Sequence, residues 1–155
     1  MKLVKTLVLT VASIGLSSSV YAANGDMNVK AKVLQPIAIT EITDLDFGDH
    51  SQGDAADAIA PGSGRAASFK VLGTPTANFT VTYANGGTTT ISTDGGGPLK
   101  DIAVTAFDDD VSQAGQLDPT GEKVVSVGAT LAAIDANQVA GDYLGTMNIT
   151  VEYAP

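Results

Sequence analysis

Apolar and polar residues alternate one by one along most of this chain, and this period of two is the pattern that most constrains the fold. The clearest run closes the chain, with its apolar positions at Met147, Ile149, Val151 and Tyr153. Such alternation places successive side chains on opposite faces of a β-strand. No convincing period of 3.6 residues occurs beyond the first 22 residues. The sequence therefore predicts an all-β protein.

Turn residues, chiefly Gly, Asn and Pro, interrupt the alternation at short intervals. The strands predicted between them are Met27–Val33, Leu45–Phe47, Ala67–Leu72, Asn78–Tyr83, Thr88–Ser92, Ile102–Phe107, Lys123–Val127 and Tyr143–Tyr153. After Pro36, Ile37 and Ile39 resume the alternation of the first strand, and Leu131–Val139 is compatible with a strand or a helical turn. About eight or nine short strands are typical of a β-sandwich or a barrel.

The residues of two connecting segments predict how those segments fold. Asn85, Gly86 and Gly87 separate the strands at Asn78–Tyr83 and Thr88–Ser92. Asn-Gly is a strong signal for a tight hairpin, because both central residues tolerate a positive φ. The stretch from Asp49 to Arg65 is rich in Gly, Ala and Asp. That composition predicts a mobile loop.

The N-terminus has the pattern of a secretory signal peptide. Lys2 and Lys5 precede a short apolar stretch at Leu7–Leu16, and small residues end the segment at Ala22. We expect cleavage between Ala22 and Ala23, which leaves residues 23–155 as a single domain. A membrane-spanning helix needs about 20 predominantly apolar residues, and this stretch is shorter. The predicted location is the periplasm, the outer cell surface or the extracellular space.

The charge balance excludes some partners. After the signal, six basic residues minus 17 acidic residues give a formal charge of −11. Nucleic acids and anionic membrane surfaces are poor partners for such a protein. The chain has no Cys, so its stability comes from packing and strand pairing instead of disulfides.

The first alternating run, Met27–Val33, has a position that bears on function. Its apolar positions are Met27, Val29, Ala31 and Val33. Lys30 and Lys32 lie on the opposite face of such a strand, where they complement an acidic body or keep the segment soluble. Two alternatives stay open: the run pairs within its own chain, or it adds a strand to a neighbouring molecule.

Residues with chemical reactivity are sparse. His50 is the only His, so a site built from two His residues is not available, and no Gly-x-Ser-x-Gly motif occurs. Asp108, Asp109 and Asp110 form a weak candidate for a Ca²⁺ site, and a solvated acidic turn is the simpler interpretation. The sequence predicts neither enzymatic activity nor a cofactor.

Three segments carry a family resemblance: Leu45-Asp46-Phe47-Gly48, Val127-Gly128-Ala129-Thr130-Leu131 and Ala140-Gly141-Asp142-Tyr143. Their order resembles a family of small exported bacterial domains of unknown function, which is similar to archaic chaperone-usher pilins and to spore-coat-U-like domains. The resemblance implies an immunoglobulin-like β-sandwich that lacks its last strand, which the N-terminal strand of the next subunit supplies. It also implies self-association, a periplasmic chaperone and an outer-membrane usher as partners.

If that implication holds, the donor side chains are Met27, Val29, Ala31 and Val33. Tyr143 then resembles the corner tyrosine of sandwich domains, which has a structural role. The function expected first is a pilin-like or surface-coat subunit that assembles by strand donation. The alternative is a self-contained secreted module that binds a glycan or Ca²⁺.

Overall fold

The computed structural model describes residues 23–155. The predicted signal peptide, 1–22, lies outside the described residues, and so does Ala22 on one side of the predicted cleavage site. Residues 33–155 form one unit, which contains all the strands, and the described residues 23–32 precede it.

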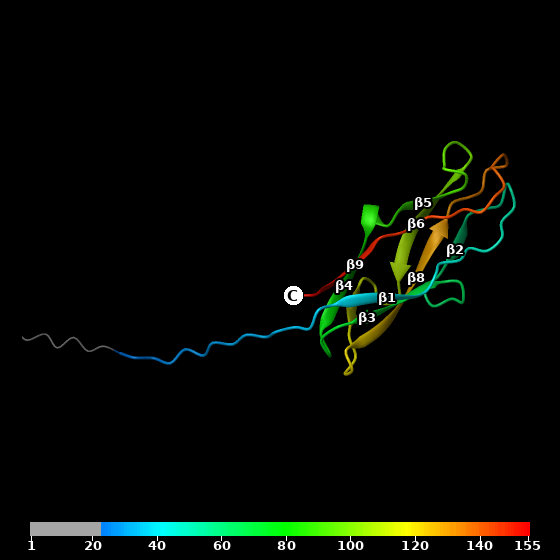
Figure 1. The fold of residues 1–155 in the computed structure, drawn as a ribbon. Helices are drawn as coiled ribbons and strands as arrows, with labels where there is room; N and C mark the ends of the chain where they lie inside the picture. Colours follow the sequence, from blue (N-terminus) through cyan, green and yellow to red (C-terminus); the bar gives the residue numbers. More distant parts are fainter. Residues whose placement is uncertain (1–22) are drawn as a thin grey trace, which may run out of the picture. The chain divides into compact units, whose positions relative to one another are not determined.

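The described chain contains nine strands and one short 3₁₀ turn, Ala84–Gly86 (Figure 1). The strands are β1 (Ala38–Thr43), β2 (Asp57–Ile59), β3 (Ala67–Leu72), β4 (Asn78–Tyr83), β5 (Thr89–Ser92), β6 (Asp101–Asp109), β7 (Ala114–Gln116), β8 (Glu122–Leu131) and β9 (Ile149–Tyr153). The predicted all-β sandwich is confirmed.

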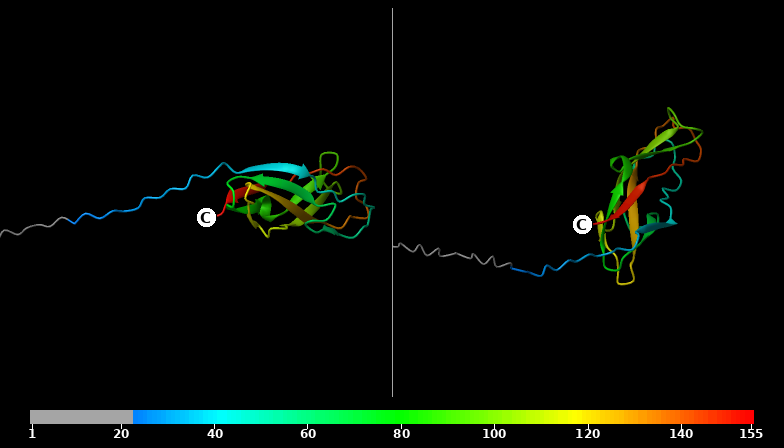
Figure 2. Two further views of the ribbon diagram at one scale, coloured as in Figure 1. Left: turned by 90° about the horizontal axis from the view of Figure 1, so that it is seen from below. Right: turned by 60° about the vertical axis from the view of Figure 1, so that its left-hand side comes forward.

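The nine strands form two sheets, in which every pairing is antiparallel. The larger sheet has the order β1-β3-β8-β6-β5, and the short β2 pairs with the end of β8 beyond β3. The smaller sheet has the order β7-β4-β9. Two further views follow the sheets from other sides, with β1 in cyan and β9 in red belonging to different sheets (Figure 2).

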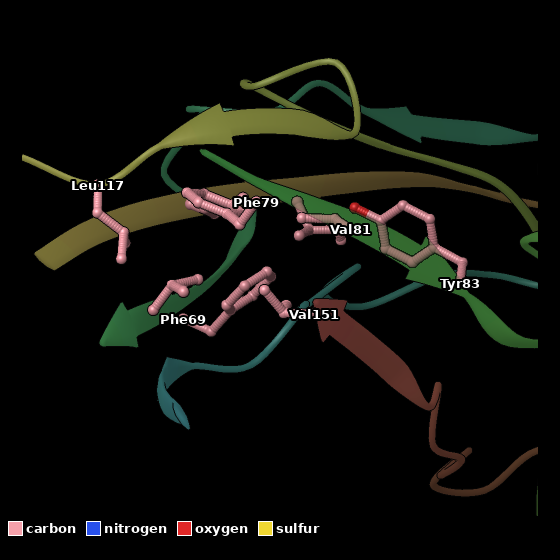
Figure 3. Close-up of a cluster of buried hydrophobic side chains, with 9 residues drawn as sticks. Phe69, Phe79, Val81, Tyr83, Leu117 and Val151 are labelled. Atoms are coloured by element: carbon pink, nitrogen blue, oxygen red, sulfur yellow. The ribbon is translucent and has the colours of Figure 1, made fainter. Parts of the chain in front are cut away.

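Alternating side chains of both sheets meet in the core. The main cluster comprises Phe69, Val71, Phe79, Val81, Tyr83, Leu117, Val125, Val127 and Val151, several of which are drawn in Figure 3. A second cluster comprises Ile102, Val104, Ala129, Leu131 and Ile134. Each fully buried Val, Leu or Phe contributes about 1.5–3 kcal/mol, so these alternating positions stabilise the sandwich.

Sequence periodicity located β3, β4 and β5 well and several other strands poorly. The predictions for β3 and β4 have the observed bounds, and the prediction for β5 differs by one residue. No strand forms at Leu45–Phe47, although Leu45 and Phe47 pack on the second cluster as the alternation implies. β2 lies within Asp49–Arg65, which was predicted to be a mobile loop. β9 is shorter than the predicted closing strand.

The strand predicted at Met27–Val33 does not form. Residues 23–37 have no regular secondary structure, and Met27, Val29 and Val33 are more than four-fifths exposed, at 84%, 83% and 92%. A strand needs a neighbouring strand to satisfy its backbone groups, and periodicity alone does not provide one.

The predicted hairpin at Asn85-Gly86-Gly87 is wrong as a pairing, although the turn forms. Asn85, Gly86 and Gly87 all have positive φ, at 51°, 65° and 74°. However, β4 pairs with β7 and β9, whereas β5 pairs with β6 in the other sheet. The turn therefore carries the chain from one sheet to the other, because both edges of β4 are already occupied.

No helix among the described residues is long and apolar enough to cross a membrane.

Candidate functional site

The free edge of β9 is the first component of the candidate site. β9 pairs only with β4, from Phe79 opposite Tyr153 to Tyr83 opposite Ile149. Two flanking hydrogen bonds show which residues of β9 bond to β4. Ala154 N–H donates to the Asn78 oxygen (3.0 Å), and Ala84 N–H donates to the Asn148 oxygen (3.0 Å). Successive residues of an antiparallel strand point their backbone N–H and C=O groups to opposite sides, so the other residues of β9 point theirs away from β4.

These outward backbone groups belong to Ile149, Val151 and Tyr153, and no described strand pairs with them. The side chains of the same residues face the core. Val151 is 7% exposed and lies opposite Val81, and Figure 3 shows both side chains in the main cluster. An edge that combines unsatisfied backbone groups with apolar side chains is a template for an additional strand.

The second component is β1, at the edge of the larger sheet. β1 pairs only with β3, and Ile39 lies opposite Val71. Residues directly opposite each other share a face of the sheet, and Val71 is fully buried, so Ile39 faces the core side. Ile39 is nevertheless 42% exposed, and all residues of β1 are exposed.

Tyr153 connects the two edges. Its hydroxyl donates to the Gln35 backbone oxygen (2.7 Å), just before β1, and accepts from the Thr74 N–H (2.7 Å), just after β3. Partly buried side chains from both edges then pack on the same main cluster; these are Ile37, Met147, Ile149 and Tyr153. The free edge of β9 and the exposed strand β1 therefore border one partly covered side of the core.

The three Asp residues of the weak Ca²⁺ candidate each accept hydrogen bonds within the fold. Asp109 is 4% exposed, and its carboxylate accepts from the Tyr83 hydroxyl (2.7 Å) and from the N–H groups of Val111 (3.1 Å) and Gln113 (2.8 Å). Burial, together with the nearby Asp109, raises the pKa of Tyr83. Asp110 accepts from the Ser126 N–H (3.0 Å).

Asp108 also bonds locally, since it accepts from the N–H of Asp109 (2.9 Å). Throughout residues 23–155, no group of three or more His, Cys, Asp or Glu side chains is placed to hold a metal ion. The structure therefore does not bring the three Asp carboxylates together as ligands.

His50 lies between two carboxylates in the segment that leads to β2. Its Nδ1 is 3.6 Å from Asp54, and its Nε2 is 3.6 Å from Asp57. Arg65 donates to both carboxylate oxygens of Asp57, at 2.7 and 3.2 Å, and also to the Phe47 oxygen (2.9 Å). The Arg65 hydrogen bond lowers the pKa of Asp57. This network joins the two ends of the segment, which is a structural role.

Tyr143 has the contacts of a corner tyrosine. Its hydroxyl donates to the Val139 backbone oxygen (2.6 Å), four residues earlier, and accepts from Gln138 Nε2 (3.0 Å). A shallow cavity of about 260 Å³ lies elsewhere, against Tyr83, Phe107 and the turn at Gly86 and Gly87. It contains no cluster of reactive side chains.

These features define a class: an all-β sandwich in which the edge of β9 is open beside the core. The chain belongs to the family described as a domain of unknown function (DUF4402), whose model matches residues 37–153. The match begins one residue before β1 and ends with β9, so Met27–Val33 lies outside it. Searches among curated proteins and among solved structures found no match.

Proposed function

We propose that this protein is an exported, non-enzymatic structural subunit, pilin-like or coat-like, that assembles by donating Met27–Val33 to the open edge of β9 in another copy. The observation that carries the proposal is the unpaired edge of β9 beside the exposed core-facing side of β1. The archaic chaperone-usher pilins that the sequence resembles assemble by donating a strand in this way.

The N-terminal segment has the features of a donor strand. Its apolar side chains alternate, and Met27, Val29 and Val33 are exposed in the single chain. Ile149, Val151 and Tyr153 offer outward backbone groups, and an added strand would satisfy them. The segment also precedes the matched family domain, as expected for a donor that is not part of the acceptor domain.

Burial and new backbone hydrogen bonds both favour addition of the donated strand. Burial of the alternating apolar side chains contributes on the order of 4–8 kcal/mol before ordering costs, at about 1.5–3 kcal/mol for each large one. Each new backbone hydrogen bond adds about 0.5–1.5 kcal/mol. In this proposal the protein acts in the periplasm or at the outer cell surface, with a periplasmic chaperone and an outer-membrane usher as partners.

A pair of matched substitutions tests the proposal in the mature protein, residues 23–155. Val29→Asp places a charge on the face that enters the core, whereas Asn28→Asp places the same charge on the opposite face. We expect Val29→Asp to abolish heat-resistant oligomers and filaments, and Asn28→Asp to retain them. Gel electrophoresis without boiling and negative-stain microscopy measure both outcomes.

Deleting Ala23–Leu34 is the stronger version of the same test, and it should leave only monomers with an intact far-UV circular dichroism spectrum. A wild-type protein that stays strictly monomeric at high concentration, with Met27–Val33 protected from hydrogen exchange, would contradict the proposal. That result would favour the self-contained binding module instead.

A further inference from the structure

The outer face of the smaller sheet carries one charged strand residue, and it lies on the open edge. The outward residues of β4 and β7 are uncharged; they are Asn78, Thr80, Thr82, Ala114 and Gln116. On β9 the outward residues are Thr150 and Glu152, both exposed. Glu152 lies opposite Thr80 and forms no ion pair with any residue of the described chain.

The N-terminal segment carries the complementary charge on the matching face. Its apolar residues have odd numbers, so Asn28, Lys30 and Lys32 would face outward in a strand. A donated strand that turns its apolar face to the core therefore places these lysines on the same outer surface as Glu152. Opposite charges on directly facing residues stabilise a pair of strands, and like charges destabilise it.

We infer that Glu152 of one copy pairs with Lys30 of the next, and that this contact sets the register of the donated strand; the inference rests on the proposed strand donation. An antiparallel addition continues the pattern of the sheet and is the more stable arrangement. Ala31 then lies opposite Val151, with Val29 opposite Tyr153 and Val33 opposite Ile149. Lys30 faces Glu152 directly.

The neighbouring registers are less favourable. A shift of two residues in one direction places Lys32 opposite Glu152, but it also places the polar Gln35 opposite Ile149, on the core side. Gln35 is already bonded to Tyr153 and Thr74 of its own chain. A shift in the other direction places Asn28 opposite Glu152, so that neither lysine faces the acid. Charge and apolar burial together therefore select one register.

A charge exchange tests the pairing in full-length mature protein. We expect Lys30→Glu/Lys32→Glu and Glu152→Lys each to slow assembly about five-fold or more, because like charges then face each other. The two variants mixed together should assemble at close to the wild-type rate, since each donor then meets an opposite charge. The triple variant should also recover. Lys100→Glu, the same charge change between β5 and β6, should have little effect.

Cysteine pairs report the register directly, because the native chain contains no Cys. Lys32→Cys with Thr150→Cys should form disulfide-linked ladders between copies, whereas Lys32→Cys with Asn148→Cys should not, since a disulfide needs Cα atoms within about 7 Å. If filaments form but the charge exchange does not restore assembly, this register is wrong and strand donation stands. The same conclusion follows if ladders form only with Lys32→Cys and Asn148→Cys. If the wild type does not assemble at all, both the register and strand donation are wrong.

Discussion

The edges of β5 and β9 are both borders of the sandwich, yet one is covered and the other is open. Ser92 of β5 exchanges backbone bonds with Leu144, at 2.9 and 3.0 Å, and the Thr89 hydroxyl donates to the Thr146 oxygen (2.8 Å). A few residues later the same segment becomes β9, whose outer edge has no described partner. Proteins commonly cover or charge their edge strands, so the contrast identifies the edge of β9 as available for another strand.

At the covered edge, the largest change in stability is expected from a substitution of Gly145. A Cβ atom on Gly145 would lie 2.6 Å from the Thr90 backbone oxygen and 3.1 Å from the Ile91 Cα. Gly145→Ala should therefore displace the covering segment and lower the free energy of unfolding by about 2–3 kcal/mol. Urea denaturation measures the change.

Gly64→Ala is the matched control, because a Cβ there meets nothing within 4 Å. Equal stabilities for Gly145→Ala and Gly64→Ala would show that the covering segment does not depend on its close approach to β5.

Local patterns predicted the strands, but long-range pairing decided the edges. β3 and β4 were located because their apolar residues alternate and are buried on one face. The turn at Asn85 was predicted from its residues, but a turn does not specify which sheet the next strand joins. β7, with Gly115 at its centre, has no apolar alternation and was missed.

The open edge itself was only partly predictable. The alternation at Met147–Tyr153 indicated a closing strand, and the resemblance implied a missing neighbour. The exposed β1 and the bonds from Tyr153 to Gln35 and Thr74 depend on contacts between residues far apart in the chain. No local pattern encodes such contacts, and the same holds for the solitary charge of Glu152 on its sheet face.

Tyr153→Phe tests the connection between the two sides of the open edge. The substitution removes the hydroxyl that bonds to Gln35 and Thr74, and it leaves the partly buried Thr74 N–H without its partner. We expect a loss of about 1–2 kcal/mol in the free energy of unfolding. Hydrogen exchange of the Thr74 amide should accelerate in parallel. If neither quantity changes, Tyr153 does not hold the start of β1 against the end of β9.

Thr89→Val gives a smaller effect at the covered edge. It keeps the shape of the side chain and removes the exposed hydroxyl that donates to Thr146. The expected loss is about 0.5–1 kcal/mol, measured by urea denaturation. Thr88→Val is the control, because the exposed Thr88 precedes β5. A loss at Thr88 as large as that at Thr89 would show that removal of a surface hydroxyl, and not of the bond to Thr146, dominates the measurement.

The smallest effect is expected in acid, where Asp101 supports β5. A hydrogen bond from Ser92 (2.6 Å), and a further one from the Gly97 backbone, hold the pKa of Asp101 below its usual value of 3.8. A carboxylate with a lowered pKa in the folded state stabilises the fold at pH values above the unfolded pKa, and that contribution is lost as the pH falls through the folded pKa.

Asp101 is exposed, so solvent limits the magnitude of this contribution. Asp101→Asn should therefore make stability fall less steeply below about pH 4 than it does in the wild type. Equal profiles for wild type and Asp101→Asn would show that the hydrogen bonds to the Asp101 carboxylate do not stabilise β5.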